Sequence, residues 1–533
     1  MSEIQKSTTH TLILDRSLSL DDAIRLIDGR MLLEPSAETM RRCTAAHERL
    51  VTIIREKRHV YGITTGFGPL ANRLVDQSVG AQLQQNLVNH LATGVGPSFD
   101  WQQARAIVLA RIMSIVQGVS GASMPAIAAL VRLINSPYAP VIPSKGTVGA
   151  SGDLTPLAHM VLCFQGVGDF MLQDGRRVDA MEALAQLGLP KMDLSQRDGL
   201  ALVNGTSAMT GVAVLNAVAA RRAISWAIAL TAGLAETQNG RVEAWHAAFG
   251  NVRPHPGQIA AAAALRRRVD GSQRVERSIL ADRRLNGVGN VTEQSAGQDA
   301  YTLRCAPQVI GAVWDTASWH ALVVETEFSA ATDNPIFPDC AADTVLVLHG
   351  GNFMGQHVGL ASDALSNAMV VLAGLAERQI ARLTDETLNR GLPAFLHRGQ
   401  AGLNSGLMGA QVTATALLAE MRSQGAASIN SISTNAANQD VVSMGTIAAR
   451  LLADKIFTIS QIHAILALAV AQAMDIMELS NPEPAFSDHA LALRQMVRTV
   501  SPPLLQDRPL GREIETLSLT LSQSDPPEIG APL

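Results

Sequence analysis

The sequence predicts a mainly α-helical fold built around a bundle of long helices. Apolar residues recur at spacings of three and four over residues 211–236, 355–382, 410–421 and 442–478. Several of these stretches exceed about 25 residues, a length typical of long helices that pack in bundles. Aromatic residues make up only 4% of the chain. A large core must therefore be packed mainly from Ala, Leu, Ile, Val and Met, which suits closely packed helices.

Nothing in the chain marks a linker between independent domains. Its 533 residues contain no long stretch rich in Pro, Gly and Ser and no fixed-period repeat. We divide the chain where the long helical patterns begin and end, into an N-terminal domain (1–208), a long-helix core (209–480) and a C-terminal helical segment (481–533). In the first of these, residues 11–15 read as a short strand, and Ser19 is a capping residue that predicts the start of a helix.

Composition and charge exclude several classes of protein. The formal net charge is −5 with both signs spread along the chain, whereas nucleic-acid binders usually carry a basic patch. The four cysteines form no C-x-x-C pair, and scattered thiols fit a reducing cytoplasm. The chain start lacks the pattern of a signal peptide, and no uninterrupted apolar stretch reaches the roughly 20 residues of a membrane span. We therefore expect a cytoplasmic protein with no metal, no nucleic-acid partner and no membrane contact.

Irregular segments separate the predicted helices. Residues 61–68 contain three glycines and two threonines, and residues 285–308, 332–353 and 398–408 are rich in Gly, Asn and Pro. In a helix bundle such segments lie at helix ends, and loops on a rigid scaffold often carry catalytic groups. We expect several of them to converge and form a site.

Residues 146–160 read GTVGASGDLTPLAHM and contain a latent electrophile. If the backbone folds back, the amide nitrogen of Gly152 can attack the carbonyl carbon of Ala150. Loss of two waters, one carrying the Ser151 hydroxyl, then leaves 4-methylidene-imidazole-5-one (MIO), a five-membered ring with an exocyclic methylene. A glycine permits the close backbone approach that this cyclisation needs. The alternative is an ordinary Gly/Ser loop that leads into a helix near Asp153.

The same string, with matching blocks elsewhere, resembles the aromatic amino acid ammonia-lyases, which comprise histidine, phenylalanine and tyrosine lyases and related aminomutases. The resemblance extends from about residue 61 to about residue 512, and residues 90–101 and 146–163 are most similar to bacterial tyrosine lyases. It implies an ammonia-lyase/fumarase-like fold with a smaller N-terminal domain that bears the MIO. It also implies a homotetramer with shared active sites and no metal or dissociable cofactor.

The resemblance implies that Tyr61 is the catalytic base in an elimination of ammonia from an α-amino acid. The family places its tyrosine base in a Tyr-Gly-x-x-Thr-Gly-Phe-Gly loop, which is present here as residues 61–68. A phenol with a pKa near ~10 must be activated by a nearby positive charge or helix end to act at neutral pH. The alternative for Tyr61 is a packed loop aromatic.

Residues 298–305 resemble the next family block. Arg304 is the natural partner of the substrate carboxylate because a guanidinium fork binds it through two hydrogen bonds. Tyr301 would be catalytic, near the amine and the MIO. The other substrate-binding residues that the resemblance implies are Leu91, Asn204, Gln298, Asn334, Phe353, Met408 and Asn438. Turn or capping roles are the alternative for Asn204, Asn334 and Phe353.

Two residues bear on the substrate. His90 would face the substrate ring, where an imidazole can bind a para-hydroxyl, and phenylalanine lyases resemble this region with an apolar residue instead. Histidine lyases also carry a histidine nearby, but they have a glutamate where Gln439 stands. Together these residues favour L-tyrosine, which would give trans-p-coumarate, the phenylpropanoid acid, with L-phenylalanine to cinnamate as a further activity.

Three alternatives stay open at this point. A histidine lyase that gives urocanate is the nearest enzyme alternative, and an aminomutase would share the catalytic residues and re-add the ammonia. A helical scaffold that binds an amino acid without turnover is the third. The intact Ala150-Ser151-Gly152 string and Tyr61 favour an enzyme over such a scaffold.

Overall fold

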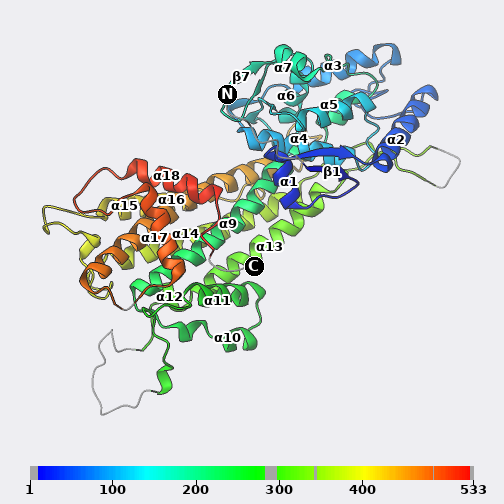
Figure 1. The fold of residues 1–533 in the computed structure, drawn as a ribbon. Coiled ribbons are helices and arrows are strands. Elements are labelled where there is room, and N and C mark those ends of the chain that lie inside the picture. The colour runs from blue at the N-terminus through cyan, green and yellow to red at the C-terminus, as the bar shows by residue number, and fades with distance from the viewer. Residues whose placement is uncertain (1–9, 283–296, 341–344, 484, 529–533) are drawn as a thin grey trace. The chain divides into compact units, whose positions relative to one another are not determined.

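The structure is a computed structural model that describes residues 10–282, 297–340, 345–483 and 485–528 (Figure 1). Helices dominate these residues and the strands are few and short, so the predicted mainly α-helical fold is confirmed. The chain forms two compact units, each discontinuous in sequence. The first comprises Met1–Val218, His320–Asp363 and Ala426–Arg450, and the second comprises Ala219–Trp319, Ala364–Gly425 and Leu451–Leu533. The expected domains are continuous in sequence, with boundaries at residues 208 and 480, and these boundaries stay a prediction.

The first unit holds all the strands of the described residues. They are β1 (His10–Leu14), β2 (Met31–Pro35), β3 (Val95–Ser98), β4 (Ala139–Pro140), β5 (Pro143–Lys145), β6 (Asp169–Met171) and β7 (Arg177–Asp179). β1 pairs with β2 in parallel, β3 with β5 antiparallel, and β4, β6 and β7 form an antiparallel sheet in that order. Its helices are α1 (Leu20–Ile27), α2 (Ala37–Arg55), α3 (Gly80–Leu91), α4 (Trp101–Ile115), α5 (Met124–Ile134), α6 (Leu154–Phe164), α7 (Ala180–Leu187) and α8 (Asp198–Val203).

The boundaries between the units fall inside four long helices. These are α9 (Ser207–Thr237), α13 (Ala306–Phe328), α14 (Gln356–Thr384) and α16 (Gly445–Ser480). The second unit also contains α10 (Ala247–Val252), α11 (Pro256–Arg268), α12 (Tyr301–Arg304), α15 (Met408–Ser423), α17 (Asp488–Val500) and α18 (Gly511–Gln523). The four predicted helical stretches are present as α9, α14, α15 and α16, with ends within a few residues of the expected ones. The sequence analysis did not predict α13. The predicted first strand and the helix that Ser19 caps are present as β1 and α1.

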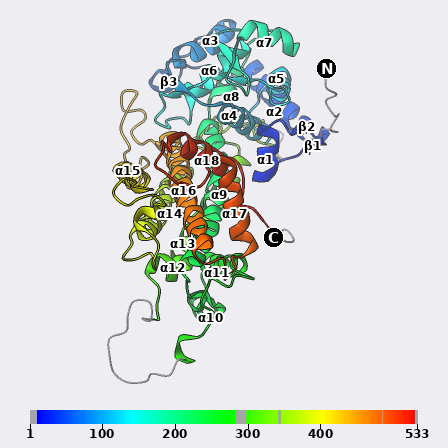
Figure 2. The ribbon, with the colours of Figure 1, turned by 60° about the vertical axis from the view of Figure 1, so that its left-hand side comes forward.

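Small aliphatic side chains form the core of the second unit, as the low aromatic content predicts. α9, α14 and α16 run alongside one another in both views (Figures 1 and 2). Their buried positions in this unit are largely Ala, Leu and Ile, and the run from Ala464 to Ala471 in α16 is almost completely buried. Alanines let helix axes approach closely and lose no side-chain entropy on burial.

A buried arginine ties the helices of the first unit together. Arg105 in α4 is 1% exposed, and its guanidinium donates only to backbone carbonyls. The acceptors are Leu26, Ile27, Ile134, Ser136 and Tyr138, at 2.5 to 3.1 Å. These carbonyls lie at or just beyond the C-termini of α1 and α5 and in the approach to β4, where unpaired carbonyls favour a cation. Arg105 therefore fixes both helix ends against α4.

Three helices are long and apolar enough to cross a membrane by length and composition alone: α9, α14 and α16. The search for uninterrupted apolar stretches did not identify them, because these helices carry isolated polar residues. Their apolar windows are 67%, 61% and 83% buried inside the protein. Packing within the protein therefore takes up much of this apolar surface.

The contact between α9 and α4 predicts a local effect on stability. A Cβ on Gly211 would lie 2.6 Å from the backbone of Ala106 and Ile107, so Gly211→Ala should destabilise the protein by about 1–3 kcal/mol through overpacking. Gly374 in α14 has only the end of the Arg422 side chain near its Cβ position, at 3.8 Å. Gly374→Ala is the matched control and should be neutral or stabilising by up to about 1 kcal/mol. Urea unfolding measures both, and equal effects would contradict the close approach.

Candidate active site

The Ala150-Ser151-Gly152 string forms a turn that doubles back between β5 and α6. Its backbone is left-handed at Ser151 (φ 54°) and Gly152 (φ 75°), and also at Gly149 (φ 75°) just before the string. A left-handed backbone costs a non-glycine residue such as Ser151 roughly 1–2 kcal/mol. Contacts from outside the turn must therefore hold it in this conformation.

One such contact is the close approach of Gly152 to Gly205. A Cβ on Gly152 would lie 2.1 Å from the carbonyl oxygen of Gly205, so the site admits only glycine. The two residues form an isolated bridge, and the backbone N–H of Asp153 donates to the same carbonyl at 2.8 Å. The turn thus lies in direct contact with the segment that joins α8 to α9.

The segment that leads into α16 holds the turn on another side. The backbone N–H of Met444 donates to the carbonyl of Val148 at 2.9 Å, and the Ser443 hydroxyl donates to the carbonyl of Gly149 at 3.3 Å. A Cβ on Gly149 would lie 2.2 Å from the Ser443 hydroxyl oxygen. Residues almost 300 positions apart in sequence therefore define the shape of the turn.

Asp153 follows the turn and is almost fully buried. Its carboxylate accepts the backbone N–H of Met209 at 2.7 Å and the hydroxyl of Thr446. Burial raises the pKa of this carboxyl to about 6, and the nearby Glu327 carboxylate acts in the same direction. Asp153 therefore links the end of the turn to the starts of α9 and α16.

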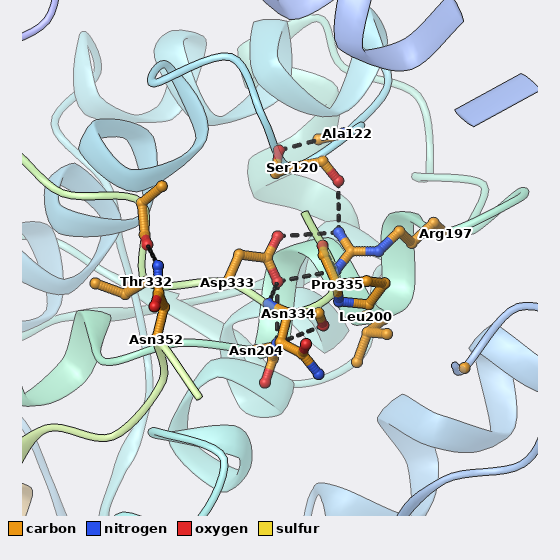
Figure 3. Close-up of polar contacts among 12 residues, drawn as sticks. Ser120, Ala122, Arg197, Leu200, Asn204, Thr332, Asp333, Asn334, Pro335 and Asn352 are labelled. Carbon is orange, nitrogen blue, oxygen red and sulfur yellow. Dashed lines mark hydrogen bonds and ion pairs between the residues drawn. The ribbon is translucent and has the colours of Figure 1, made fainter. Parts of the chain in front are cut away.

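Asn204, one of the predicted site residues, belongs to a buried polar network (Figure 3). Its side-chain N–H group donates to Asp333 Oδ1 at 3.0 Å and to the carbonyl of Asn334 at 2.8 Å. Arg197 donates to both carboxylate oxygens of Asp333 at 2.9 Å, and both side chains are fully buried. Asn334 Oδ1 accepts the backbone N–H of Gly350 at 2.7 Å. The structure thus brings Asn204 and Asn334 together.

Tyr61 lies in the expected loop and is half-buried. Its hydroxyl oxygen accepts the backbone N–H of Gly68 at 2.9 Å, and its own N–H donates to His349 Nε2 at 3.2 Å. Gln84 of α3 connects this loop to α8, because its side chain donates to the carbonyl of Gly62 at 2.8 Å and accepts the N–H of Leu200 at 2.9 Å. α8 leads directly to Asn204, so one chain of contacts joins the Tyr61 loop to the Asn204 network.

His90 and Leu91 lie at the C-terminal end of α3. The His90 side chain is exposed, and its Nδ1 lies 2.9 Å from the carbonyl oxygen of Asn86, one helical turn earlier. The chain just after α3 is tied to α6, because the backbone N–H of Gly94 donates to His159 Nε2 at 3.0 Å. The end of α3 is thus anchored to the helix that follows the Ala-Ser-Gly turn.

Gln298, Tyr301 and Arg304 form a group of their own in the second unit. Arg304 donates to Gln298 Oε1, and its guanidinium carbon lies 4.8 Å from the ring centroid of Tyr301. The Tyr301 side chain is 70% exposed. The indole N–H of Trp245 donates to the carbonyl of Leu303 at 3.0 Å and anchors this short helix. Met408, at the start of α15, also lies in the second unit and is partly exposed.

The remaining predicted residues lie on loops of the first unit. Phe353 is half-buried just before α14. Asn438 and Gln439 lie in a tight loop in which Thr434 and Gln439 exchange backbone hydrogen bonds at 3.0 and 3.3 Å. Among the described residues, no hydrogen bond joins Phe353, Asn438 or Gln439 to the Asn204 network.

Sequence reasoning missed the residues that support the turn. Asp153 was read only as a residue near a helix start, and nothing in the sequence pointed to Arg197, Asp333 or Ser443. Asp333 directly precedes Asn334, but only the structure shows that its carboxylate is buried and therefore needs a partner. Ser123 caps α5 by accepting the backbone N–H of Ala126. Within the described residues no cluster of His, Cys, Asp or Glu could hold a metal ion.

Comparisons with known proteins agree with this geometry. The model of the aromatic amino acid lyase family matches residues 18–499. The chain is 61% identical to a tyrosine ammonia-lyase of Cereibacter sphaeroides over 518 residues, which is 96% of this chain and 98% of the relative. It is 38% identical to a histidine ammonia-lyase of Caldanaerobacter subterraneus, covering 93% of each chain. The crystal structure of a tyrosine aminomutase from Streptomyces globisporus superposes with a TM-score of 0.90 at 36% identity, covering 97% of each chain.

The raised pKa of Asp153 predicts a pH-dependent effect on stability. Between pH 3.8 and about 6 the folded protein binds more protons at Asp153 than the unfolded chain does. The free energy of unfolding of the wild type should therefore fall as the pH rises through this window, by roughly 3 kcal/mol. Asp153→Asn removes this titration, so the difference between wild type and variant should fall by that amount from pH 4 to pH 7.

Urea unfolding at the two pH values measures this difference. Asp76→Asn is the control, because Asp76 is exposed and the hydrogen bonds from Ser78 lower the pKa of its carboxyl. For this variant the same difference should not fall over the range. A difference for Asp153→Asn that stays constant or rises with pH would contradict the assignment.

Proposed function

Because the chain belongs to the aromatic amino acid lyase family, we propose that it eliminates ammonia from L-tyrosine to give trans-p-coumarate, using an MIO formed from Ala150, Ser151 and Gly152. The observation that carries this proposal is the doubled-back turn, in which Gly152 lies so close to Gly205 that only glycine fits. The 61% identity to a tyrosine ammonia-lyase over nearly the full chain supports the substrate and the C–N lyase chemistry.

The residues of the turn fit an MIO. The backbone reverses at Ser151 and Gly152, which is the shape that attack of the Gly152 nitrogen on the Ala150 carbonyl requires. Contacts that hold the turn from two sides reduce the entropy that cyclisation would otherwise cost. An MIO supplies an electrophilic methylene that accepts the substrate amine, which ordinary side chains cannot do. We propose that the ring forms autocatalytically, since the chain itself supplies the compressed turn.

Tyr61 is proposed to remove the β-proton of the substrate. The Gly68 N–H donates to its phenol oxygen, and this hydrogen bond holds the hydroxyl group in place for proton transfer. Arg304 is proposed to hold the substrate carboxylate. The contact of its guanidinium with Gln298 and the Tyr301 ring keeps the fork oriented. Tyr301 is proposed to lie near the substrate amine and the MIO.

The hydrogen bond of His90 favours tyrosine over phenylalanine. A carbonyl oxygen only accepts, so Nδ1 carries the proton that it donates to Asn86. In the neutral ring Nε2 is then left as an acceptor, which can take the hydrogen of a para-hydroxyl group. Phenylalanine would leave this acceptor unpaired, a cost of about 1–3 kcal/mol. L-Phenylalanine is therefore proposed as a minor substrate that gives cinnamate.

Two enzyme alternatives are less well supported. Gln439 is neutral and cannot supply the charge that a glutamate offers to the imidazole of histidine, and the histidine lyase relative is only 38% identical. An aminomutase would use the same residues, but the solved tyrosine aminomutase is 36% identical, against 61% for the lyase. Incubation with tyrosine, phenylalanine and histidine, followed by the absorbance of each unsaturated acid and by chromatography for β-tyrosine, separates all of these activities.

We also propose that the protein works as a homotetramer in the cytoplasm. Exposed apolar side chains on three long helices support assembly, since monomers rarely expose so many. They are Trp319 and Leu322 on α13, Leu360 and Val371 on α14, and Val412 on α15, each 46–63% exposed. The four cysteines are free, which fits a reducing compartment. The proposed partners are the amino acid substrate and further copies of the chain, without nucleic acid or membrane.

The proposed origin of the MIO predicts the effect of Ser151→Ala. The variant should fold and assemble like the wild type, because Ser151 makes no side-chain contact that the fold needs, but it should lose turnover at least about a thousandfold. Intact mass measures the cause, since the wild type should be lighter than its sequence by two waters and the variant should not. A variant with a near wild-type rate would exclude the proposed MIO.

The proposed contact of His90 predicts a change of substrate preference. In His90→Phe the phenol of tyrosine loses its acceptor, and the apolar ring favours phenylalanine. The ratio of kcat/KM for tyrosine to that for phenylalanine should fall at least about tenfold, or ~1.4 kcal/mol. His159→Phe is a control for disturbance of the loop after α3. Equal loss of both activities in His90→Phe would mean that His90 only supports the structure.

A further inference from the structure

The Arg197–Asp333 ion pair lies next to the Asn204 side chain, which is hydrogen-bonded to Asp333 (Figure 3). Arg197 grips both carboxylate oxygens and also donates to the carbonyls of Ser120 at 2.6 Å and Pro335 at 3.1 Å. Asp333 Oδ1 accepts three donors, namely Arg197, the Asn204 amide and the backbone N–H of Asn334 at 2.7 Å. The carboxylate is therefore the centre of a rigid network.

This network decides which way the Asn204 amide points. The two groups that face it, the Asp333 carboxylate and the Asn334 carbonyl, only accept hydrogen bonds. The atom that faces them must therefore be the N–H₂ group, and both of its hydrogens are used. Among the described residues no donor is bonded to Asn204 Oδ1, so this oxygen is the part of the amide left for another partner.

We propose that Arg197 and Asp333 are positioning residues that fix Asn204 with its amide oxygen toward the bound substrate. An oxygen acceptor suits the α-ammonium group of an amino acid and is repelled by its carboxylate. Asn204 would then recognise the group that leaves in the reaction, while Arg304 binds the carboxylate. This inference rests on the proposed function, because it takes the substrate to be an amino acid.

The inference is tested by binding rather than turnover. The Ser151→Ala background cannot form an MIO, so bound L-tyrosine stays intact. Trans-p-coumarate has the same ring and carboxylate but lacks the amine. Calorimetric affinities for the two ligands therefore isolate the interaction with the ammonium group.

Asp333→Asn should invert the amide of Asn204. Arg197 needs an acceptor and would take the oxygen of the new amide, which turns its N–H₂ group toward Asn204. Asn204 would then present its own N–H₂ group to the substrate. We expect the affinity for L-tyrosine to fall at least about tenfold, the size expected for a lost hydrogen bond to a charged group, while the affinity for p-coumarate stays within about twofold.

Three further variants separate an effect on the Asn204 amide from a general effect on the fold. Arg197→Lys keeps the positive charge and leaves Asp333 a carboxylate, so it should preserve most of the preference for tyrosine. Asn204→Ala should weaken tyrosine as Asp333→Asn does, and combining the two should cause no further loss, because both act on one amide. Arg105→Lys alters another buried arginine and should lower the melting temperature without changing the ratio of the two affinities.

Three results would overturn the proposal. They are an equal loss of affinity for both ligands in Asp333→Asn, no loss for either, or independent losses that multiply in the variant that combines Asp333→Asn with Asn204→Ala. If the Ser151→Ala protein itself bound neither ligand, the proposed substrate would be wrong. The comparison would then be made with the amino acid and unsaturated acid that the substrate panel identifies.

Discussion

The close approach of Gly152 to Gly205 is the constraint on which the rest of the site depends. It holds the Ala-Ser-Gly turn in a left-handed conformation that the chain would not adopt alone. The bridge between the two glycines and the bond from the Asp153 N–H keep the turn against the start of α9. The segment before α16 closes the other side. Strain at Ser151 is thus maintained by contacts from two separate parts of the sequence.

Buried charges stabilise the segment against which the turn rests. Arg111 donates to the carbonyl of Asn204, and burial lowers the pKa of this arginine to about 10. Arg197 and Asp333 pair beside the Asn204 side chain, and Asp153 lies on the far side of Gly205. Isolated charges at these positions would cost several kcal/mol each, so each needs its partners. The result is a polar scaffold that is rigid around the residues proposed to meet the substrate.

The proposed substrate contact of His90 depends on a local contact within one helix, whereas the proposed electrophile depends on contacts between segments that are distant in sequence. His90 takes its tautomer from a carbonyl one turn earlier in its own helix, which is a local property of α3. The Ala-Ser-Gly turn and Asp153 depend on contacts with Gly205, with Met209 at the start of α9, and with the segment that leads into α16. Under the proposed function, substitutions at the end of α3 would change the substrate, whereas formation of the MIO would depend on the packing around the turn.

The sequence by itself determined the helical class, the extent of α9, α14, α15 and α16, and the string that is proposed to carry the chemistry. Periodic apolar positions and short motifs are local signals, and local signals can be recognised without knowledge of the fold. Only the tertiary structure decided what supports that string. The supporting residues act through partners that are distant in sequence, and the sequence of a single chain contains no signal of those pairings. These residues are Asp153, Arg197, Asp333 and Ser443. The orientation of the Asn204 amide is the clearest case, because it follows from two acceptors that the fold places beside it.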